Sequence, residues 1–216
     1  MVILRPGGPV MFVFDVADTE AGPNAPPLPP GVVSPFEIRS GKIGKPLDRT
    51  IENARRDGVL VEEVQAGSQH AGSIRVTPAG GRIEFPSKPP MGKAPPPPVP
   101  LRYMLLIAGT LSPKGKYATL VHELAHLYCC HLGTPHPGWW PDRRGLSHAA
   151  REFEAESVTW LVCERRGIEN PSAQYLAGYL SKNDEVPSIS LDCVMKSGGL
   201  IEKMGDERMK RRKERV

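Results

Sequence analysis

The sequence has no apolar run near the roughly 20 residues that a membrane-spanning helix requires. It also lacks a basic segment followed by a continuous apolar stretch at its start, because Arg5, Pro6 and Pro9 interrupt that region. Only four cysteines occur and none forms a Cys-x-x-Cys pair, which excludes a dense disulfide scaffold. These absences predict a soluble, cytoplasmic protein whose thiols are reduced and mostly buried.

The charge balance does not establish nucleic-acid binding. The chain has 28 Lys and Arg against 24 Asp and Glu, for a net charge of +4. Much of this excess lies in a basic tail over residues 206–216. The tail is expected to be a frayed, solvated terminus, and contact with nucleic-acid phosphate is a weaker alternative. The composition does not indicate an oligomeric state.

Aromatic residues are also scarce at 6%, whereas proline and glycine are plentiful, with 24 and 22 copies. Two proline-rich stretches, 23–35 and 86–100, are predicted to be extended connectors. A PxxP ligand for a partner domain is the alternative for Pro95 to Pro100. The length of 216 residues fits one domain over residues 1–205, with a strand-rich, proline-rich part to residue 100 and a helical part from residue 101.

The pattern of apolar residues predicts an α+β fold, because strands come first and helices later. Short β-branched or aromatic runs predict strands at 10–15, 59–65, 73–77, 82–85 and 102–108. Helical spacing and capping residues predict helices at 47–57, 113–132, 147–166, 172–181 and 188–204. The strand at 102–108 is expected at the edge of the sheet beside a cleft, where an extended substrate could add as another strand.

The helix over 113–132 contains an HExxH motif, His122-Glu123-Leu124-Ala125-His126. Residues four apart share one helix face, so the two imidazoles can bind one zinc ion. Glu123 can then take a proton from the attacking water as general base. The alternative is that two ordinary helix histidines flank an accidental glutamate.

A catalytic zinc needs a third protein ligand, and the next predicted helix offers one. His148, Glu152 and Glu156 follow one another at four-residue spacing and therefore share a face. Glu152 is predicted to be the third ligand, and Glu156 to accept a hydrogen bond from a ligating imidazole. The two glutamates could exchange roles. His148 could also replace Glu152 or donate to an oxyanion, although a surface histidine is the favoured interpretation.

The stretch HELAHLYCCHLG, followed by EFEAE over residues 152–156, resembles the ImmA/IrrE group of metallopeptidases. It also resembles the C-terminal zincin part of ArdC-like antirestriction proteins. In those families a Glu-x-x-Ala-Asn/Asp/Glu motif supplies a metal ligand, and it maps here onto Glu152, Ala155 and Glu156. The similarity extends to residues 12–16 and 174–177.

The resemblance implies a zincin-like domain and a protein substrate, since relatives in the ImmA/IrrE group cleave or inactivate repressors. ArdC-like proteins carry a single-stranded-DNA-binding domain before this region, for which the chain has no room before Met1. DNA binding is therefore not expected on this ground.

Other residues near the motif favour structural interpretations. His131 is predicted to be a cation near the negative end of its helix or a hydrogen-bonded surface residue, and metal ligation is the weaker alternative. Tyr175 and Tyr179 are expected in the core, although either could donate to an oxyanion. Cys129 and Cys130 are expected to be buried and not to ligate metal. Trp139 and Trp140 are equally suited to line a cleft or to pack over the core.

Together these features predict a zinc-dependent metalloendopeptidase that hydrolyses a protein or peptide substrate. A DNA-associated regulator is one candidate for that substrate. The rival prediction is a non-catalytic antirestriction or regulatory binding protein that retains a structural metal site. A Glu123→Gln substitution separates the two, because it removes proteolysis only in the first.

Overall fold

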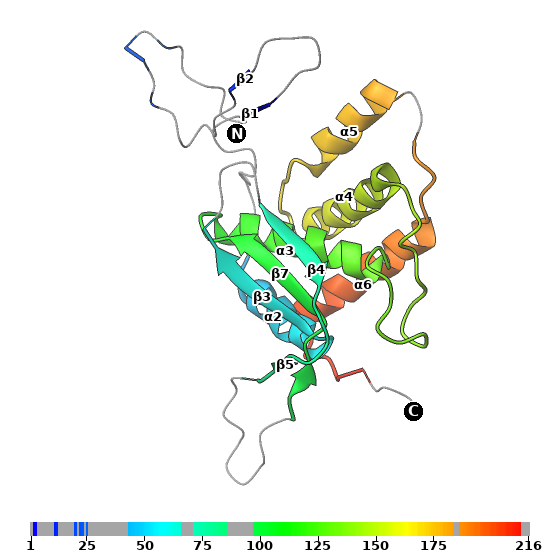
Figure 1. Cartoon of the computed structure of the whole chain (residues 1–216). Coiled ribbons are helices and arrows are strands. Elements are labelled where there is room, and N and C mark those ends of the chain that lie inside the picture. The colour runs from blue at the N-terminus through cyan, green and yellow to red at the C-terminus, as the bar shows by residue number, and fades with distance from the viewer. Residues whose placement is uncertain are drawn as a thin grey trace.

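A computed structural model describes residues 2–3, 11–12, 20, 22–23, 25, 43–65, 71–85, 97–183 and 186–212 of the chain. Within them the strands are β1 (Val2–Ile3), β2 (Met11–Phe12), β3 (Val59–Val64), β4 (Gly72–Val76), β5 (Arg82–Ile83), β6 (Val99–Pro100) and β7 (Tyr103–Ala108). The helices are α2 (Lys45–Arg56), α3 (Pro113–Tyr128), α4 (His148–Arg165), α5 (Ser172–Asn183) and α6 (Leu191–Asp206). This order of elements confirms the α+β prediction (Figure 1).

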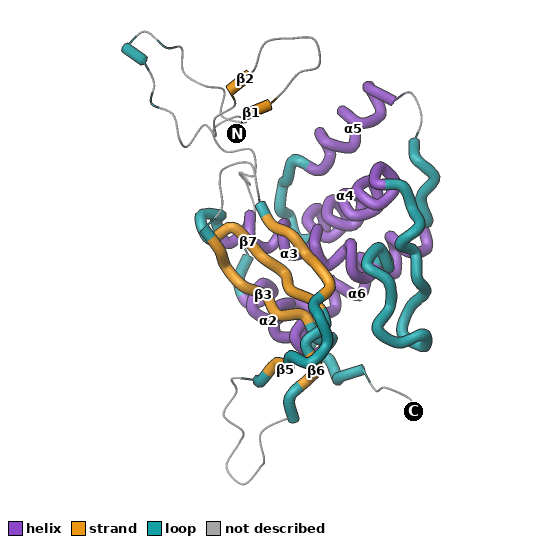
Figure 2. Tube along the Cα trace, viewed as in Figure 1, coloured by secondary structure: helices purple, strands orange, loops and turns teal. Residues whose placement is uncertain are grey.

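The main sheet has three strands in the order β3-β7-β4, with β7 parallel to β3 and antiparallel to β4 (Figure 2). The prediction that residues 102–108 form a sheet edge is therefore wrong, because β7 is central and β4 is an edge. The physical reason is that β7 is apolar on both faces. Leu105 and Ile107 are buried and Leu106 is half-buried, a pattern that suits a strand with a neighbour on each side.

The core lies between this sheet and the helices. Helix α3 contacts β4 and β7 on one side and α4 and α6 on the other, and α2 covers β3 (Figure 1). Leu120, Leu124 and Leu127 of α3 are fully buried in one cluster with residues of the sheet, α4 and α6. The HExxH helix is thus held on several sides.

Capping residues set the helix boundaries. The Ser112 and Ser147 side chains accept hydrogen bonds from backbone N–H groups in the first turns of α3 and α4. The prediction that the first of these helices continues to residue 132 is wrong. It ends at Tyr128, and Cys130 adopts a left-handed backbone with φ of 70°. This turn directs the following residues back toward the helix.

The ends of the chain differ partly from prediction. Of the strand expected at 10–15 only residues 11–12 are described, and they pair with β1. Most of both proline-rich stretches lies outside the described residues. The tail is not frayed over residues 207–212, because Arg212 pairs with Asp57 of the α2 C-cap and Arg211 stacks on Phe85. None of the described helices is long and apolar enough to cross a membrane.

Candidate metal centre

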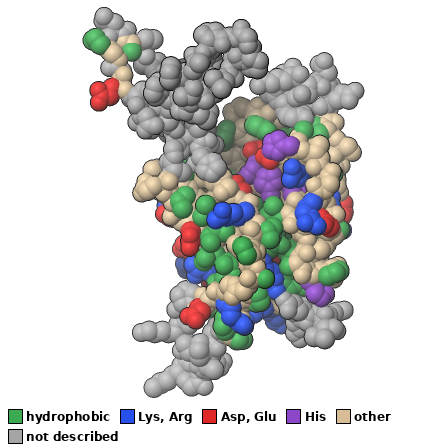
Figure 3. Space-filling model, viewed as in Figure 1, with side chains coloured by type: hydrophobic (Ala, Val, Ile, Leu, Met, Phe, Trp, Pro, Cys, Tyr) green, Lys and Arg blue, Asp and Glu red, His purple; other side chains and the backbone are tan. Residues whose placement is uncertain are grey.

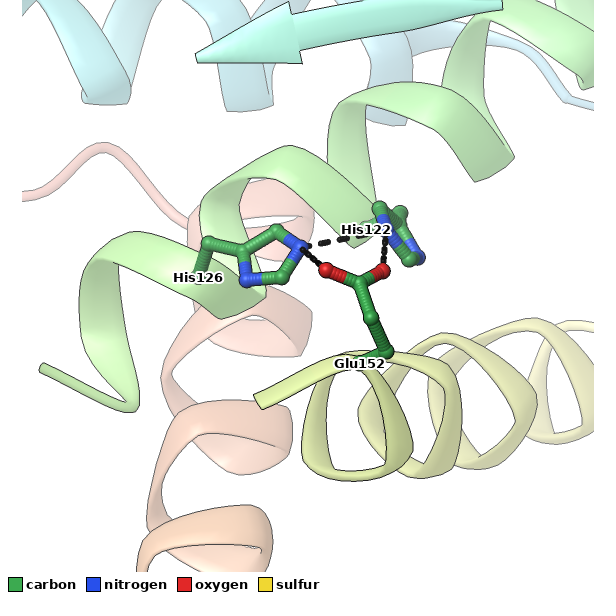
Figure 4. A group of neighbouring side chains, drawn as sticks. All are labelled: His122, His126 and Glu152. Atoms are coloured by element: carbon green, nitrogen blue, oxygen red, sulfur yellow. Dashed lines mark hydrogen bonds and ion pairs between the residues drawn. The ribbon is translucent and has the colours of Figure 1, made fainter. Parts of the chain in front are cut away.

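Helices α3 and α4 bring His122, His126 and Glu152 together (Figure 4). The Nε2 atoms of the two histidines are 3.2 Å apart. Glu152 Oε1 lies 3.5 Å from His126 Nε2, and its Oε2 lies 3.7 Å from His122 Nε2. Two atoms bound tetrahedrally at about 2.1 Å from one zinc ion are about 3.4 Å apart. The three side chains therefore fit a tetrahedral metal ion with one position left open.

Packing fixes this arrangement. Leu124, between the two histidines on α3, and Ala155, between the two glutamates on α4, are both fully buried in the same core cluster. Their burial sets the position of one helix against the other, so the ligand face of α4 meets that of α3. The site is assembled by the fold and not by a mobile loop.

Glu156 lies beside the imidazole of His122. Its Oε1 lies 3.3 Å from His122 Nδ1. A carboxylate at this nitrogen holds a proton on Nδ1 and leaves the Nε2 lone pair directed at the metal position. His148 lies next to the group, with Nδ1 3.5 Å from Glu152 Oε1, and its side chain is 79% exposed.

The electrostatics of the metal-free site favour a positive charge. Burial opposes the charged form of His122, but hydrogen bonds to Glu152 and Glu156 outweigh it and raise the pKa of His122 to about 10. Burial and the charge on His122 lower the pKa of His126 to about 3. A proton thus sits where the carboxylates would stabilise a metal cation, and metal binding would displace it.

Glu123 is a residue of α3, and its side chain lies next to the edge strand β4. Burial raises the pKa of Glu123 to about 7, and the positive charge of His122 and a hydrogen bond from the Ile74 backbone N–H only partly oppose this rise. Gly72 lies so near that a Cβ atom there would be 3.6 Å from Glu123 Cγ. A carboxyl group with a pKa near neutrality is well matched to proton transfer at neutral pH.

A second group of possible ligands, Cys129, His131 and Glu154, is buried beneath the first. Glu154 already accepts two hydrogen bonds from Arg143 and one from the Ser190 backbone N–H. Burial raises the pKa of the Cys129 thiol to about 12. A neutral thiol and an occupied carboxylate are poor zinc ligands, so the first group suits a metal better.

The surface position that was one prediction for His131 is wrong. Its side chain is 1% exposed, and its Nε2 lies 2.8 Å from Glu154 Oε2, so it is not on the surface. Glu154 itself was not selected, although a signal existed. It lies on the same helix stripe as the buried residues Ala150 and Val158, and an acid on an apolar stripe predicts a buried, paired charge.

The remaining candidates act mainly in packing. Trp140 is buried and its Nε1 donates to the Gly133 carbonyl, while Trp139 lies under the guanidinium of Arg102. All four thiols are free, and those of Cys129, Cys130 and Cys163 are buried, as expected. Tyr175 is 46% exposed, so its predicted core position is wrong. The side chain of Tyr179 lies outside the described residues.

An open pocket lies at the Val76 end of β4, away from the Gly72 end that lies near Glu123. Its volume is about 400 Å³, and its lining combines apolar side chains such as Val76, Leu101 and Leu132 with the two cations Arg102 and Arg144. Figure 3 shows histidine and acidic side chains reaching the surface above the hydrophobic side chains of this face. The side chains of His122, His126 and Glu152 are each partly exposed, so the candidate metal centre is reachable from solvent.

Comparisons with protein-family models, with curated proteins and with solved structures gave no match for this chain. The inferences about function therefore depend on the residues and their geometry. The strongest of these is the convergence of His122, His126 and Glu152 from two helices.

Proposed function

We propose that this chain is a zinc-dependent peptidase with His122, His126 and Glu152 as metal ligands and Glu123 as general base. The observation that carries the proposal is the convergence of the three side chains: the two histidine Nε2 atoms are 3.2 Å apart, and each lies 3.5 or 3.7 Å from one carboxylate oxygen of Glu152. The position of the HExxH helix under a sheet edge supports a zincin-like fold. The motif resemblance to ImmA/IrrE metallopeptidases supports the same assignment.

In this proposal each residue of the site has a distinct role. His122, His126 and Glu152 would hold a zinc ion, which would supply Lewis-acid chemistry by polarising a carbonyl and making water more acidic. Glu123 accepts the proton of the attacking water and passes it to the departing amine nitrogen. Glu156 holds the ring of His122 in the orientation that binding requires.

The structure also suggests where an extended substrate would lie. Strand β4 is a sheet edge, and its Ile74 N–H contacts Glu123, so a chain adding to β4 would pass beside the general base. Backbone pairing of this kind tolerates many side chains. The pocket near Val76 and Leu132 would accept a side chain of the substrate.

Zinc content tests the ligand assignment. The control variant is Glu164→Ala, which changes an exposed glutamate of α4, the helix that carries Glu152. Elemental analysis should find about one zinc ion per chain in the wild type and in this control. His126→Ala and Glu152→Ala should hold much less. Equal zinc in all four proteins would overturn the assignment.

Hydrolysis of unfolded casein or a quenched peptide library tests the activity. Glu123→Gln should keep its zinc and lose hydrolysis by on the order of 10²- to 10⁴-fold, because it cannot accept the proton. Zinc-loaded wild-type protein that cleaves nothing, or that cleaves no faster than Glu123→Gln, would refute the peptidase and favour a regulatory protein with a structural metal.

A further inference from the structure

The buried histidine that follows the motif returns to touch the second metal ligand. Cys130, in the left-handed conformation, turns the chain after α3 so that His131 lies against His126. The two Nδ1 atoms are 3.0 Å apart. Two ring nitrogens at this distance form a hydrogen bond only if one carries the hydrogen and the other offers a lone pair.

Glu154 decides which of the two carries it. The Glu154 carboxylate can only accept, and its Oε2 lies 2.8 Å from His131 Nε2, so that nitrogen bears a hydrogen. Arg143 donates to both oxygens of the same carboxylate and neutralises its charge. With its hydrogen on Nε2, His131 offers its Nδ1 lone pair to the Nδ1–H of His126, the arrangement that leaves His126 Nε2 free to bind a metal.

We propose that His131 and Glu154 are positioning residues that set the tautomer of His126. Glu154 holds the hydrogen of His131 on Nε2, so His131 Nδ1 accepts the Nδ1–H of His126. The lone pair of His126 is thereby placed on Nε2, which faces His122 and Glu152. This inference rests on the proposed metal site and adds residues that no motif assigns to it.

The two ligand histidines are thus oriented in different ways. His122 meets a carboxylate directly, through Glu156. His126 meets one through a second imidazole, and the charge of that carboxylate is balanced by Arg143. We call the chain of hydrogen bonds from Glu154 through His131 to His126 the relay. It should act mainly on the ring orientation and tautomer of His126. This role gives a reason for the buried ion pair between Arg143 and Glu154.

Zinc affinity measured by competition with a chromogenic chelator tests the relay without any substrate. His131→Leu removes the acceptor and should weaken zinc binding about 10- to 100-fold, as is typical for loss of a partner of a metal ligand. His131→Asn keeps an oxygen where the Nδ1 atom lies and should retain most of the affinity. His136→Leu, in the next loop, removes an imidazole as a control and should bind zinc as the wild type does.

Nuclear magnetic resonance of ¹⁵N-labelled histidine tests the tautomers in the wild type, so no variant has to fold. In the metal-free protein, two-bond proton–nitrogen spectra should place the hydrogen of His126 on Nδ1 and that of His131 on Nε2. A purely structural role for His131 would not fix the His126 tautomer.

The outcomes separate this inference from the proposed function. Wild type that binds no zinc would refute the metal site. Wild type that binds zinc, together with a folded His131→Leu variant of equal affinity, would refute only the relay. A hydrogen on His126 Nε2 in the metal-free wild type would also refute the relay.

Discussion

The carboxylate of Glu154 should make the metal-free protein lose stability in acid. Its side chain is 0% exposed. Burial opposes ionisation, but hydrogen bonds from His131, Arg143 and Ser190 outweigh it and lower the pKa of Glu154 from 4.5 to about 2. The folded pKa is below the unfolded value, so the stabilisation is complete above pH 4.5 and disappears as the pH falls toward 2. At about 1.4 kcal/mol per pH unit, the contribution is about 3 kcal/mol.

Urea unfolding with a chelator present measures this contribution. Tryptophan fluorescence should be followed from pH 7 to pH 2, with Glu154→Gln as the variant that cannot titrate at this position. The wild type should have a larger free energy of unfolding than Glu154→Gln at pH 7. This difference should shrink by about 3 kcal/mol as the pH falls from 4.5 toward 2. Glu164→Gln, changed at an exposed site on the same helix, should follow the wild type at every pH. A gap between wild type and Glu154→Gln that stays constant with pH would refute the reasoning.

Three substitutions test the packing of the fold by the same unfolding assay at pH 7. Gly72→Ala would place a Cβ atom 2.5 Å from Thr119 Cγ2, so we expect a loss of about 1–3 kcal/mol. Gly199→Ala, with no atom within 4 Å of its Cβ, should stabilise α6 by about 0.5–1 kcal/mol, and a loss of stability there would contradict the packing described. Tyr128→Phe removes the buried hydroxyl that donates to Asp57 over 3.1 Å and should lose about 1–2 kcal/mol, whereas no change would mean that this hydrogen bond contributes nothing.

The sequence predicts most helices and strands because their signals are local. Ser112 and Ser147 cap α3 and α4, and Gly167 follows the end of α4 with a positive φ. The burial of β7 also follows from its short apolar run. The order of the strands could not be predicted, because pairing of β7 with both β3 and β4 depends on contacts far apart in the chain.

Some residues of the candidate site are also predicted by local spacing, whereas others depend on how the helices pack. The pairs His122–His126 and Glu152–Glu156 follow from helical spacing, and the structure brings them together. His131 was misplaced because the helix was extended to residue 132, and a left-handed cysteine gives no sequence signal of the kind that glycine gives. Its contact with Glu154 depends on how α3 and α4 pack.

The left-handed turn at Cys130 restricts which residues this position tolerates. A non-glycine residue in this conformation is disfavoured by roughly 1–2 kcal/mol, and here the Leu127 carbonyl and the Arg143 N–H hold it by hydrogen bonds. Glycine or asparagine should fit at position 130 with less strain, whereas valine or isoleucine should open the turn. The backbone conformation of Cys130 places His131 against His126. A substitution at a residue that binds no metal can therefore still decide how well the site is assembled.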